Sequence, residues 1–319
     1  MFKPLTLGLA MASFVAAAGA QEVRQINFGI ISTESSQNLK STWQPVLEDL
    51  AKKTGLKVNA FFASDYAGII EGMRFNKVQV AWFGNKSAME AVDRAGGEIF
   101  AQMINADGTK GYYSHLIVNK DSPLQNLQDV LKNSKSLSFG NGDPNSTSGF
   151  LVPSYYVFAQ NHVDPKTAFK VTRTANHETN ALSVANKQVD VATCNSEMMD
   201  KLKDAQPEKF GQIKVVWTSP LIPSDPLVMR KDLPEATKKK VKDFFYGYGA
   251  TAQEKDNLMK LSKLAGFRPS TNAQLLPIRQ LELFKERNKL EADAALAPAQ
   301  KQAKLADIDH QLAELAKQL

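Results

Sequence analysis

The sequence predicts an α/β protein of two lobes, joined by two crossings of the chain and followed by a C-terminal helical extension. Three observations support this fold class. Short apolar runs typical of strands alternate with amphipathic helical stretches from residue 25 to residue 119. The same alternation restarts at residue 127 and continues to residue 219. Prolines between residues 220 and 226 then precede another apolar run, Leu227–Met229, which indicates a second crossing.

The first lobe alternates strand and helix, as expected of a largely parallel sheet, because a helix lets the chain return to the same edge. Its first helix should bury one apolar face, formed by Leu39, Trp43, Val46, Leu47 and Leu50. Strands are expected at Gln25–Ile31, Lys57–Phe62, Val78–Phe83, Glu98–Met103 and Tyr113–Asn119, and helices at 37–54, from Ala67, and at Lys86–Ala95.

The second lobe repeats this pattern, and the chain then returns to the first. Strands are expected at Ser136–Gly140, Phe169–Thr174, Val189–Asn195 and Ile213–Ser219, and helices at Leu127–Lys132, His177–Lys187 and Glu197–Ala205. After the crossing, a helix should span Asp232–Gly247, and Thr251 with Glu254 has capping-box spacing for the next. We expect lobe I at 21–115 and 224–283, lobe II at 116–223, and the extension at 284–319. Ligands of open α/β sheets bind beyond the carboxyl ends of the strands, so two such lobes predict a cleft between them.

Residues 1–20 have the features of a secretory signal. Lys3 precedes a short apolar stretch, and Ala18-Gly19-Ala20 suits cleavage after Ala20. The mature protein should therefore be exported and soluble. The one cysteine, Cys194, lies in an apolar strand-like run and is expected to be a buried small hydrophobe. The formal net charge is +6, and the basic residues are dispersed among acids, which does not indicate a nucleic-acid-binding protein.

The C-terminal tail is rich in Ala, Lys, Leu, Gln and Glu. Its apolar residues repeat at alternating spacings of three and four, as in a short coiled-coil seam: Leu305, Ile308, Leu312, Leu315 and Leu319. Two interpretations are open. The helix packs on its own body, or it packs on a partner helix and forms a homodimer.

The most informative stretch is the strand, glycine-rich turn and helix between residues 137 and 158. Turn-forming residues fill positions 140–145, and Ser146, Thr147 and Ser148 follow before the apolar positions of a helix. Hydroxyls beside the free N–H groups of a helix start suit a tetrahedral oxyanion such as a phosphate or phosphonate. The alternative is a capped helix start without a ligand. Pro153 leaves open whether the helix begins near Ser148 with a bend or at Val152.

Other polar residues fall at expected junctions of strands and helices: Tyr66, Tyr112, His177, Glu197 and Asp225. Ser146, His177 and Asp225 could suggest a hydrolase triad, but the sequence around Ser146 lacks the G-x-S-x-G elbow. The sequence also has no H-E-x-x-H, paired-cysteine or P-loop motif. We therefore expect a binding protein with no catalytic residues, no metal and no cofactor, rather than an enzyme.

The chain resembles the periplasmic phosphonate-binding proteins (PhnD type) of ATP-driven importers over residues 26 to about 290. The resemblance implies a type II periplasmic binding protein fold and a high-affinity periplasmic receptor for alkylphosphonates, with 2-aminoethylphosphonate as the preferred ligand type and an ABC permease as partner. The matching stretches are NFGIISTESSQNLK, VNAFFASDYAGIIEGMRFNKVQVAWFGN, SAMEAVDRA, FGNGDPNSTSGFLVPSYYVFA, HETNALSVANKQVDVAT and SPLIPSDP.

The resemblance also implies roles at the acidic end of the ligand. Ser146, Thr147 and Ser148 would hold the phosphonate oxygens through hydroxyl and backbone donors. Tyr66 would reach the same oxygens from the other lobe, and His177 would add a donor. Charge-assisted hydrogen bonds of this kind are about twice as strong as neutral ones.

The remaining roles concern the rest of the ligand. Tyr112 is expected to be a phosphonate-binding residue as well, and it would border the cleft and contact the ligand. Glu197 and Asp225 would pair with the ligand's ammonium group. Two carboxylates at this end would disfavour plain phosphate, which leaves them buried without a cation.

Overall fold

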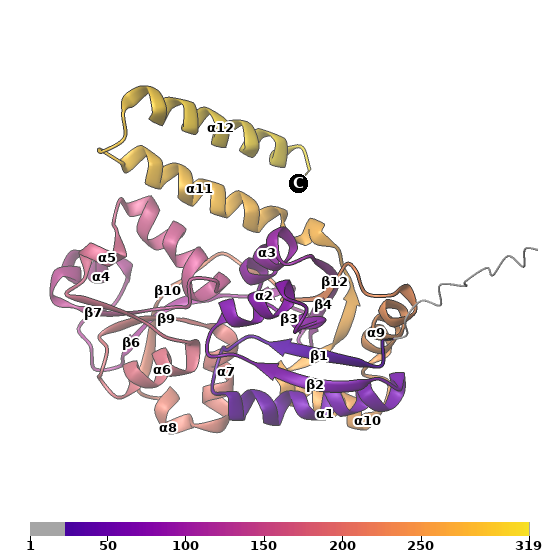
Figure 1. Ribbon diagram of the computed structural model, residues 1–319. Helices are drawn as coiled ribbons and strands as arrows, with labels where there is room; N and C mark the ends of the chain where they lie inside the picture. The colour runs from indigo at the N-terminus through magenta and orange to yellow at the C-terminus, as the bar shows by residue number, and fades with distance from the viewer. Residues whose placement is uncertain (1–22, 319) are drawn as a thin grey trace, which may run out of the picture.

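The structure is a computed structural model that describes residues 23–318 (Figure 1). The expected signal segment 1–20, its cleavage point after Ala20, and Leu319 lie outside the described residues. Two separate β-sheets, each covered by helices, form two lobes, and a pair of long helices lies along one side of the molecule (Figure 1). Between residues 23 and 318 no helix combines the length and the apolar character needed to cross a membrane.

The first lobe is built on a six-stranded sheet in the order β13-β4-β12-β3-β1-β2. Its strands are β1 (Gln25–Ile30), β2 (Lys57–Phe62), β3 (Val80–Trp82), β4 (Gly97–Asn105), β12 (Pro226–Arg230) and β13 (Leu264–Pro269). Its helices are α1 (Ser36–Thr54), α2 (Tyr66–Arg74), α3 (Asn85–Arg94), α9 (Glu235–Gly247) and α10 (Ala252–Ser262). β1 is parallel to β2 and β3, but β12 enters between β3 and β4 and is antiparallel to both.

The second lobe is built on a five-stranded sheet in the order β10-β6-β9-β7-β8. Its strands are β6 (Ser114–Asn119), β7 (Ser138–Asn141), β8 (Val171–Thr174), β9 (Val191–Asn195) and β10 (Ile213–Thr218). Its helices are α4 (Leu127–Asn133), α5 (Pro165–Ala168), α6 (His177–Ala185), α7 (Ser196–Ala205) and α8 (Pro207–Phe210), with short helical turns η1 (Ser134–Ser136), η2 (Thr147–Leu151), η3 (Ser154–Phe158) and η4 (Ala159–Asn161).

The expectation of largely parallel sheets was wrong. In the second sheet β7 is parallel to β8 and β9, whereas β6 is antiparallel to β9 and β10. In both lobes the antiparallel pairs come from strands next to the crossings. β6 and β12 are the first strands after the two crossings; they enter their sheets without a crossover helix and run opposite to both neighbours. The edge strand β13 is also antiparallel to β4.

The two crossings pair with each other as a short antiparallel ribbon, β5 (Gly111–Tyr112) with β11 (Ile222–Pro223). A Cβ at Gly111 would lie 1.8 Å from the carbonyl oxygen of Ile222, so this close approach requires glycine. The predicted fold class, two α/β lobes with two crossings, is confirmed.

Aromatic residues fill the core of each lobe. In the first lobe Phe28 packs on Trp43, with ring centroids 5.1 Å apart. In the second, Phe139 stacks on Phe169 at 4.6 Å and meets the edge of Phe158 at 5.3 Å. The predicted apolar face of α1 is buried throughout, and Cys194 is fully buried as expected.

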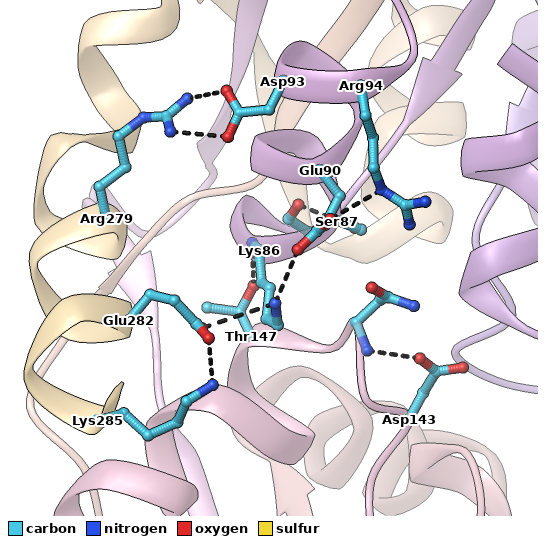
Figure 2. A network of polar contacts seen from close by, with 12 residues as sticks. Lys86, Ser87, Glu90, Asp93, Arg94, Asp143, Thr147, Arg279, Glu282 and Lys285 are labelled. Atoms are coloured by element: carbon cyan, nitrogen blue, oxygen red, sulfur yellow. Dashed lines mark hydrogen bonds and ion pairs between the residues drawn. The ribbon is translucent and has the colours of Figure 1, made fainter. Parts of the chain in front are cut away.

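The C-terminal extension is a pair of antiparallel helices, α11 (Leu276–Ala292) and α12 (Pro298–Ala316), preceded by the short turn η5 (Asn272–Leu275). α11 contacts both lobes: Arg279 forms a two-point ion pair with Asp93 of α3 (Figure 2), and Phe284 stacks on Tyr155 of η3. α12 lies on the other side of α11 and buries Ile308. The helix therefore packs on its own body, the first of the two interpretations. The expected boundary at residue 284 falls within α11.

Candidate ligand-binding site

A small cavity of about 30 Å³ lies between the two lobes. Residues of both sheets and of the crossing strands face it. Every residue that sequence reasoning singled out for ligand binding lines this one cavity: Tyr66, Tyr112, Ser146, Thr147, Ser148, His177, Glu197 and Asp225. Within the described ranges, no grouping of His, Cys, Asp and Glu side chains could hold a metal ion.

The hydroxyl segment follows β7 and a tight turn. Gly142 donates its N–H to the carbonyl of Gly149 at 3.0 Å, and a Cβ on Gly142 would lie 2.4 Å from that oxygen. Ser146 caps the helical turn η2 by accepting the N–H of Gly149 at 2.9 Å. Ser146 therefore both caps the turn and lines the cavity, so the two interpretations of this segment are compatible.

The helical structure opens at Thr147 rather than at Val152, which resolves the alternatives raised by Pro153. The chain forms two successive π-helical turns, and Pro153 stands at the boundary between them, where its missing N–H is tolerated. Wide turns of this kind are frequent at functional sites. They hold the Ser146–Ser148 segment against the cavity.

His177, the first residue of α6, faces these hydroxyls. Its Nε2 lies 3.4 Å from the Oγ atoms of both Ser146 and Ser148. Burial lowers the pKa of its imidazole to about 4, so the ring is neutral at physiological pH. Its Nδ1 is buried and has no hydrogen-bond partner in the described part of the chain. A hydrolase relay would need a carboxylate at Nδ1, so the triad geometry is not present among these residues.

Two buried tyrosines complete the uncharged lining. Tyr66 begins α2 and lines the cavity from the first lobe, together with Ser146 of the second lobe. Tyr112 lies in the crossing strand β5 and lines the cavity with Asp225, whose nearby charge adds to the effect of burial on the pKa of the phenol. Burial raises the pKa of both phenols above the ordinary value, so both stay protonated and can donate.

Two carboxylates, Glu197 and Asp225, also line the cavity; we call them its carboxylate end, and the hydroxyl, phenol and imidazole groups its hydroxyl end. Asp225, between β11 and β12, is 5% exposed, and its Oδ2 accepts the indole N–H of Trp82 at 3.1 Å. Its Oδ1 is buried without a partner among residues 23–318. Burial, and then the nearby charge of Glu197, raise the pKa of Asp225 well above its usual value. Burial likewise raises the pKa of Glu197, which lies in the first turn of α7.

This arrangement can recognise a ligand that is negative at one end and positive at the other. Neutral hydroxyl, phenol and imidazole groups donate at the first end without carrying charge. At the second end, two carboxylates share a poorly solvated space, where a cation would lower the free energy of their ionised forms.

Sequence reasoning missed Trp82 and Lys201, which also line the cavity. Trp82 could have been found from its polar atom, because a buried indole N–H needs an acceptor. Lys201 forms an ion pair with Glu34 of the first lobe at 2.5 Å, and its charge opposes the upward shift in the pKa of Glu197. No local signal in the sequence points to that pairing.

Comparisons with known proteins agree with this geometry. A family model described as "ABC transporter, phosphonate, periplasmic substrate-binding protein" matches residues 28–275. The "Phosphonates-binding periplasmic protein" of Escherichia coli is 60% identical over 295 residues, covering 92% of this chain and 87% of that protein. The "Phosphate-import protein PhnD" of Mycolicibacterium smegmatis is 32% identical over 230 residues, covering 69% and 70%.

Solved structures agree as well. A crystal structure of a binding-protein component of an ABC phosphonate transporter from Pseudomonas aeruginosa is 60% identical, with a TM-score of 0.91, and covers 93% of this chain and 98% of that one. PhnD1 of Prochlorococcus marinus, solved with methylphosphonate, is 22% identical, with a TM-score of 0.72 over 82% of this chain and 97% of that one, and supports the fold alone.

The predicted resemblance, the type II fold and the assignment to binding proteins rather than enzymes are thus confirmed. The family match spans the whole cavity lining, from the first strand to the turn before α11. This chain belongs to the family of periplasmic phosphonate substrate-binding proteins of ABC transporters.

Proposed function

We propose that this protein is a high-affinity receptor for 2-aminoethylphosphonate and related alkylphosphonates, which it delivers to an ABC permease by closing its cleft. One observation carries the proposal. A single cavity is lined by neutral hydrogen-bond donors and by two carboxylates, buried Asp225 and half-buried Glu197. An aminophosphonate has the matching charges, an anionic headgroup and an ammonium group.

At the anionic end, the hydroxyls and N–H groups of Ser146, Thr147 and Ser148 bind the phosphonate oxygens. Tyr66 donates from the first lobe and His177 from the second, while Tyr112 borders the ligand where the chain crosses. The neutral state of these groups supports this role, because none must lose a charge or a solvation shell when the anion enters.

At the cationic end, Glu197 and Asp225 bind the ammonium group. The partnerless Oδ1 of Asp225 supports this role, since a buried carboxylate oxygen without a donor is costly. The ammonium group would supply that donor. Trp82 holds the other oxygen of Asp225 in place.

Calorimetric titration of the purified protein tests this function. We expect tight binding of 2-aminoethylphosphonate, weaker binding of methylphosphonate, and still weaker binding of phosphate and phosphite. The relatives include a "Phosphate-import protein" and a probable "phosphite binding protein", so these two ions are the necessary competitors. Equal weak heats for all four compounds would overturn the proposal.

The limits of the lobes remain a proposal: 21–115 and 224–283 for lobe I, 116–223 for lobe II, and 284–319 for the extension, with residue 284 inside α11.

Export also remains a proposal in its details. We expect the mature chain to begin at Gln21, because a small-residue cleavage point precedes it. Amino-terminal sequencing of protein isolated from the periplasm tests this, and a chain that begins at Met1 would contradict it.

A homodimer through α12 is a further part of the proposal. Leu305, Leu312 and Leu315 lie on the same seam of α12 as buried Ile308 and keep part of their surface exposed, so a second copy would pack beside α11 and not replace it. Light scattering should give a dimer mass for the full chain and a monomer mass for Leu312→Glu. A monomer mass for both would contradict the dimer.

A further inference from the structure

Three helices of the first lobe begin at the boundary with the second lobe, and each start receives an oxygen from across the cleft. The Oε2 of Glu178 accepts the N–H of Ser35 at 2.7 Å, before α1. The Oδ2 of Asp143 accepts the N–H of Tyr66 at 3.1 Å, at the start of α2. The Oγ1 of Thr147 accepts the N–H of Lys86 at 2.8 Å, at the start of α3, and Figure 2 shows Thr147 beside Lys86.

These donors need an acceptor from elsewhere, because the first N–H groups of a helix have none within it. The N-cap of α3 is Gly84, which offers no side chain, and the bond between Lys86 and Thr147 is buried. In α2, Asp65 satisfies only the N–H of Gly68. The second lobe therefore completes the caps of the first, and the carboxylates also meet the positive ends of helix dipoles.

Glu178 makes the most extensive of these contacts. Its Oε1 accepts the side-chain amide of Asn38 at 2.8 Å, in addition to the bond with Ser35, and its own N–H donates to the carbonyl of Thr33 at 3.4 Å. Every partner that its side chain has among the described residues belongs to the first lobe. The residue is joined to the second lobe through α6 alone.

The capping residues are neighbours of the proposed ligand-binding residues. Glu178 follows His177, and Asp143 lies in the turn that leads to Ser146. Neither Glu178 nor Asp143 is part of the cavity lining that the described chain forms, whereas Thr147 is. The capping residues and the ligand-binding residues of the second lobe therefore move as one body. The caps can form only when the two lobes are in contact.

We propose that Glu178, Asp143 and Thr147 are positioning residues that hold the lobes closed by capping α1, α2 and α3, and that they thereby set the residence time of the ligand. This inference rests on the proposed function, because it concerns the closed state of the same cleft. Bonds present only in the closed state oppose opening, so their loss speeds ligand release and leaves the encounter rate unchanged.

Substitution of Glu178 tests the proposal most cleanly. Asp143 also accepts the N–H of Asn145 within its own turn, so its removal would disturb local structure. The variants are Glu178→Ala and Glu178→Gln, where Gln keeps one acceptor oxygen. The matched control is Glu208→Ala, an exposed glutamate in the first turn of α8.

The first measurement is stopped-flow fluorescence with 2-aminoethylphosphonate and with methylphosphonate, since Trp82 lines the cavity. For Glu178→Ala we expect the dissociation rate to rise about threefold to tenfold, by the same factor for both ligands. The association rate should stay unchanged, Glu178→Gln should be intermediate, and Glu208→Ala should match the wild type. Unchanged dissociation, or a change for one ligand only, would overturn the proposal.

The second measurement is amide hydrogen exchange on the ligand-free protein, which needs no assumption about the ligand. Glu178→Ala should speed exchange at the starts of α2 and α3 as well as α1, because all three caps open together. Faster exchange confined to α1 would indicate a local cap and overturn the proposal. Calorimetry that shows no binding by the wild type would instead reject the proposed function, and the exchange result would still decide the question of closure.

Discussion

The two ends of the cavity are built in different ways. The hydroxyl end comes mainly from one continuous segment, Ser146–Ser148, with His177 beside it. The carboxylate end combines Glu197 of the second lobe with Asp225 at the return crossing, and it depends on Trp82 from a third place in the chain. The first end can be recognised from a local pattern, whereas the second exists only when the two lobes come together.

The same burial has opposite consequences at the two ends. It lowers the pKa of His177 and raises the pKa of Tyr66, so the hydroxyl end is neutral, as suits donors for an anion. At the other end it raises the pKa of Asp225 and Glu197, although ionised carboxylates are the forms that pair with an amine. The hydroxyl end is therefore already in the neutral form that binds an anion. The ionised form of the carboxylate end is stabilised only when the ammonium group binds.

The substitution with the largest expected effect removes a carboxylate from the carboxylate end and leaves the hydroxyl end intact. Glu197→Ala should weaken binding of 2-aminoethylphosphonate by about 2–5 kcal/mol, because the ammonium group loses a carboxylate partner inside the closed cleft. Methylphosphonate has no amine and should keep its affinity. Calorimetry with both ligands measures the difference, and an equal loss for the two would contradict the role of Glu197.

At the hydroxyl end, His177 should make stability depend on pH. Its pKa is about 4 in the folded state and about 6.5 when unfolded, so the unfolded chain takes up a proton first as the pH falls. This contribution is fully present above pH 6.5 and is lost as the pH falls through 4. Relative to His177→Asn, the wild type should lose about 3 kcal/mol of unfolding free energy over that window.

Urea unfolding at a series of pH values measures this loss. His310→Asn, at an exposed position of α12, is the control and should follow the wild type. Parallel curves for the wild type and His177→Asn would show that His177 is not buried in its neutral form.

A third test of the difference between the two ends removes the charge of Asp225 and keeps the shape of its side chain. Because its folded-state pKa is raised, ionised Asp225 destabilises the ligand-free protein as the pH rises above about 4. Asp225→Asn keeps an acceptor for Trp82 and should stabilise the ligand-free protein at pH 7 by about 1–2 kcal/mol, while weakening binding of the aminophosphonate. Thermal unfolding with and without ligand checks both effects, and a lower melting temperature without ligand would contradict the first.

The smallest effect concerns the rim of the cleft. Lys263 and Asp204 form an ion pair between the lobes at 2.8 Å, but their side chains are 46% and 59% exposed. Exposed pairs contribute little, so Lys263→Ala should change ligand affinity by less than about 0.5 kcal/mol. A larger loss in calorimetry would mean that rim charges, and not only buried groups, determine closure.

The sequence by itself determined most helices and strands, because their signals are local. Periodic apolar positions, the cap at Asp65 and the capping box of Thr251 and Glu254 lie within one or two turns of the elements that they define. The same is true of the Ser146–Ser148 segment, whose hydroxyls are adjacent in the chain. The roles of Glu197 and Asp225 came from the family resemblance and not from a local pattern.

Only the tertiary structure decided which distant groups meet. It inserted β12 antiparallel between β3 and β4, and it brought Trp82 to Asp225. It also joined Glu178, in the first turn of α6, to the start of α1. Each of these bonds joins residues more than a hundred positions apart, where no local spacing constrains the partner. The packing of the two lobes determines which of these residues meet, and the pairs are stable because buried polar groups need hydrogen-bond partners.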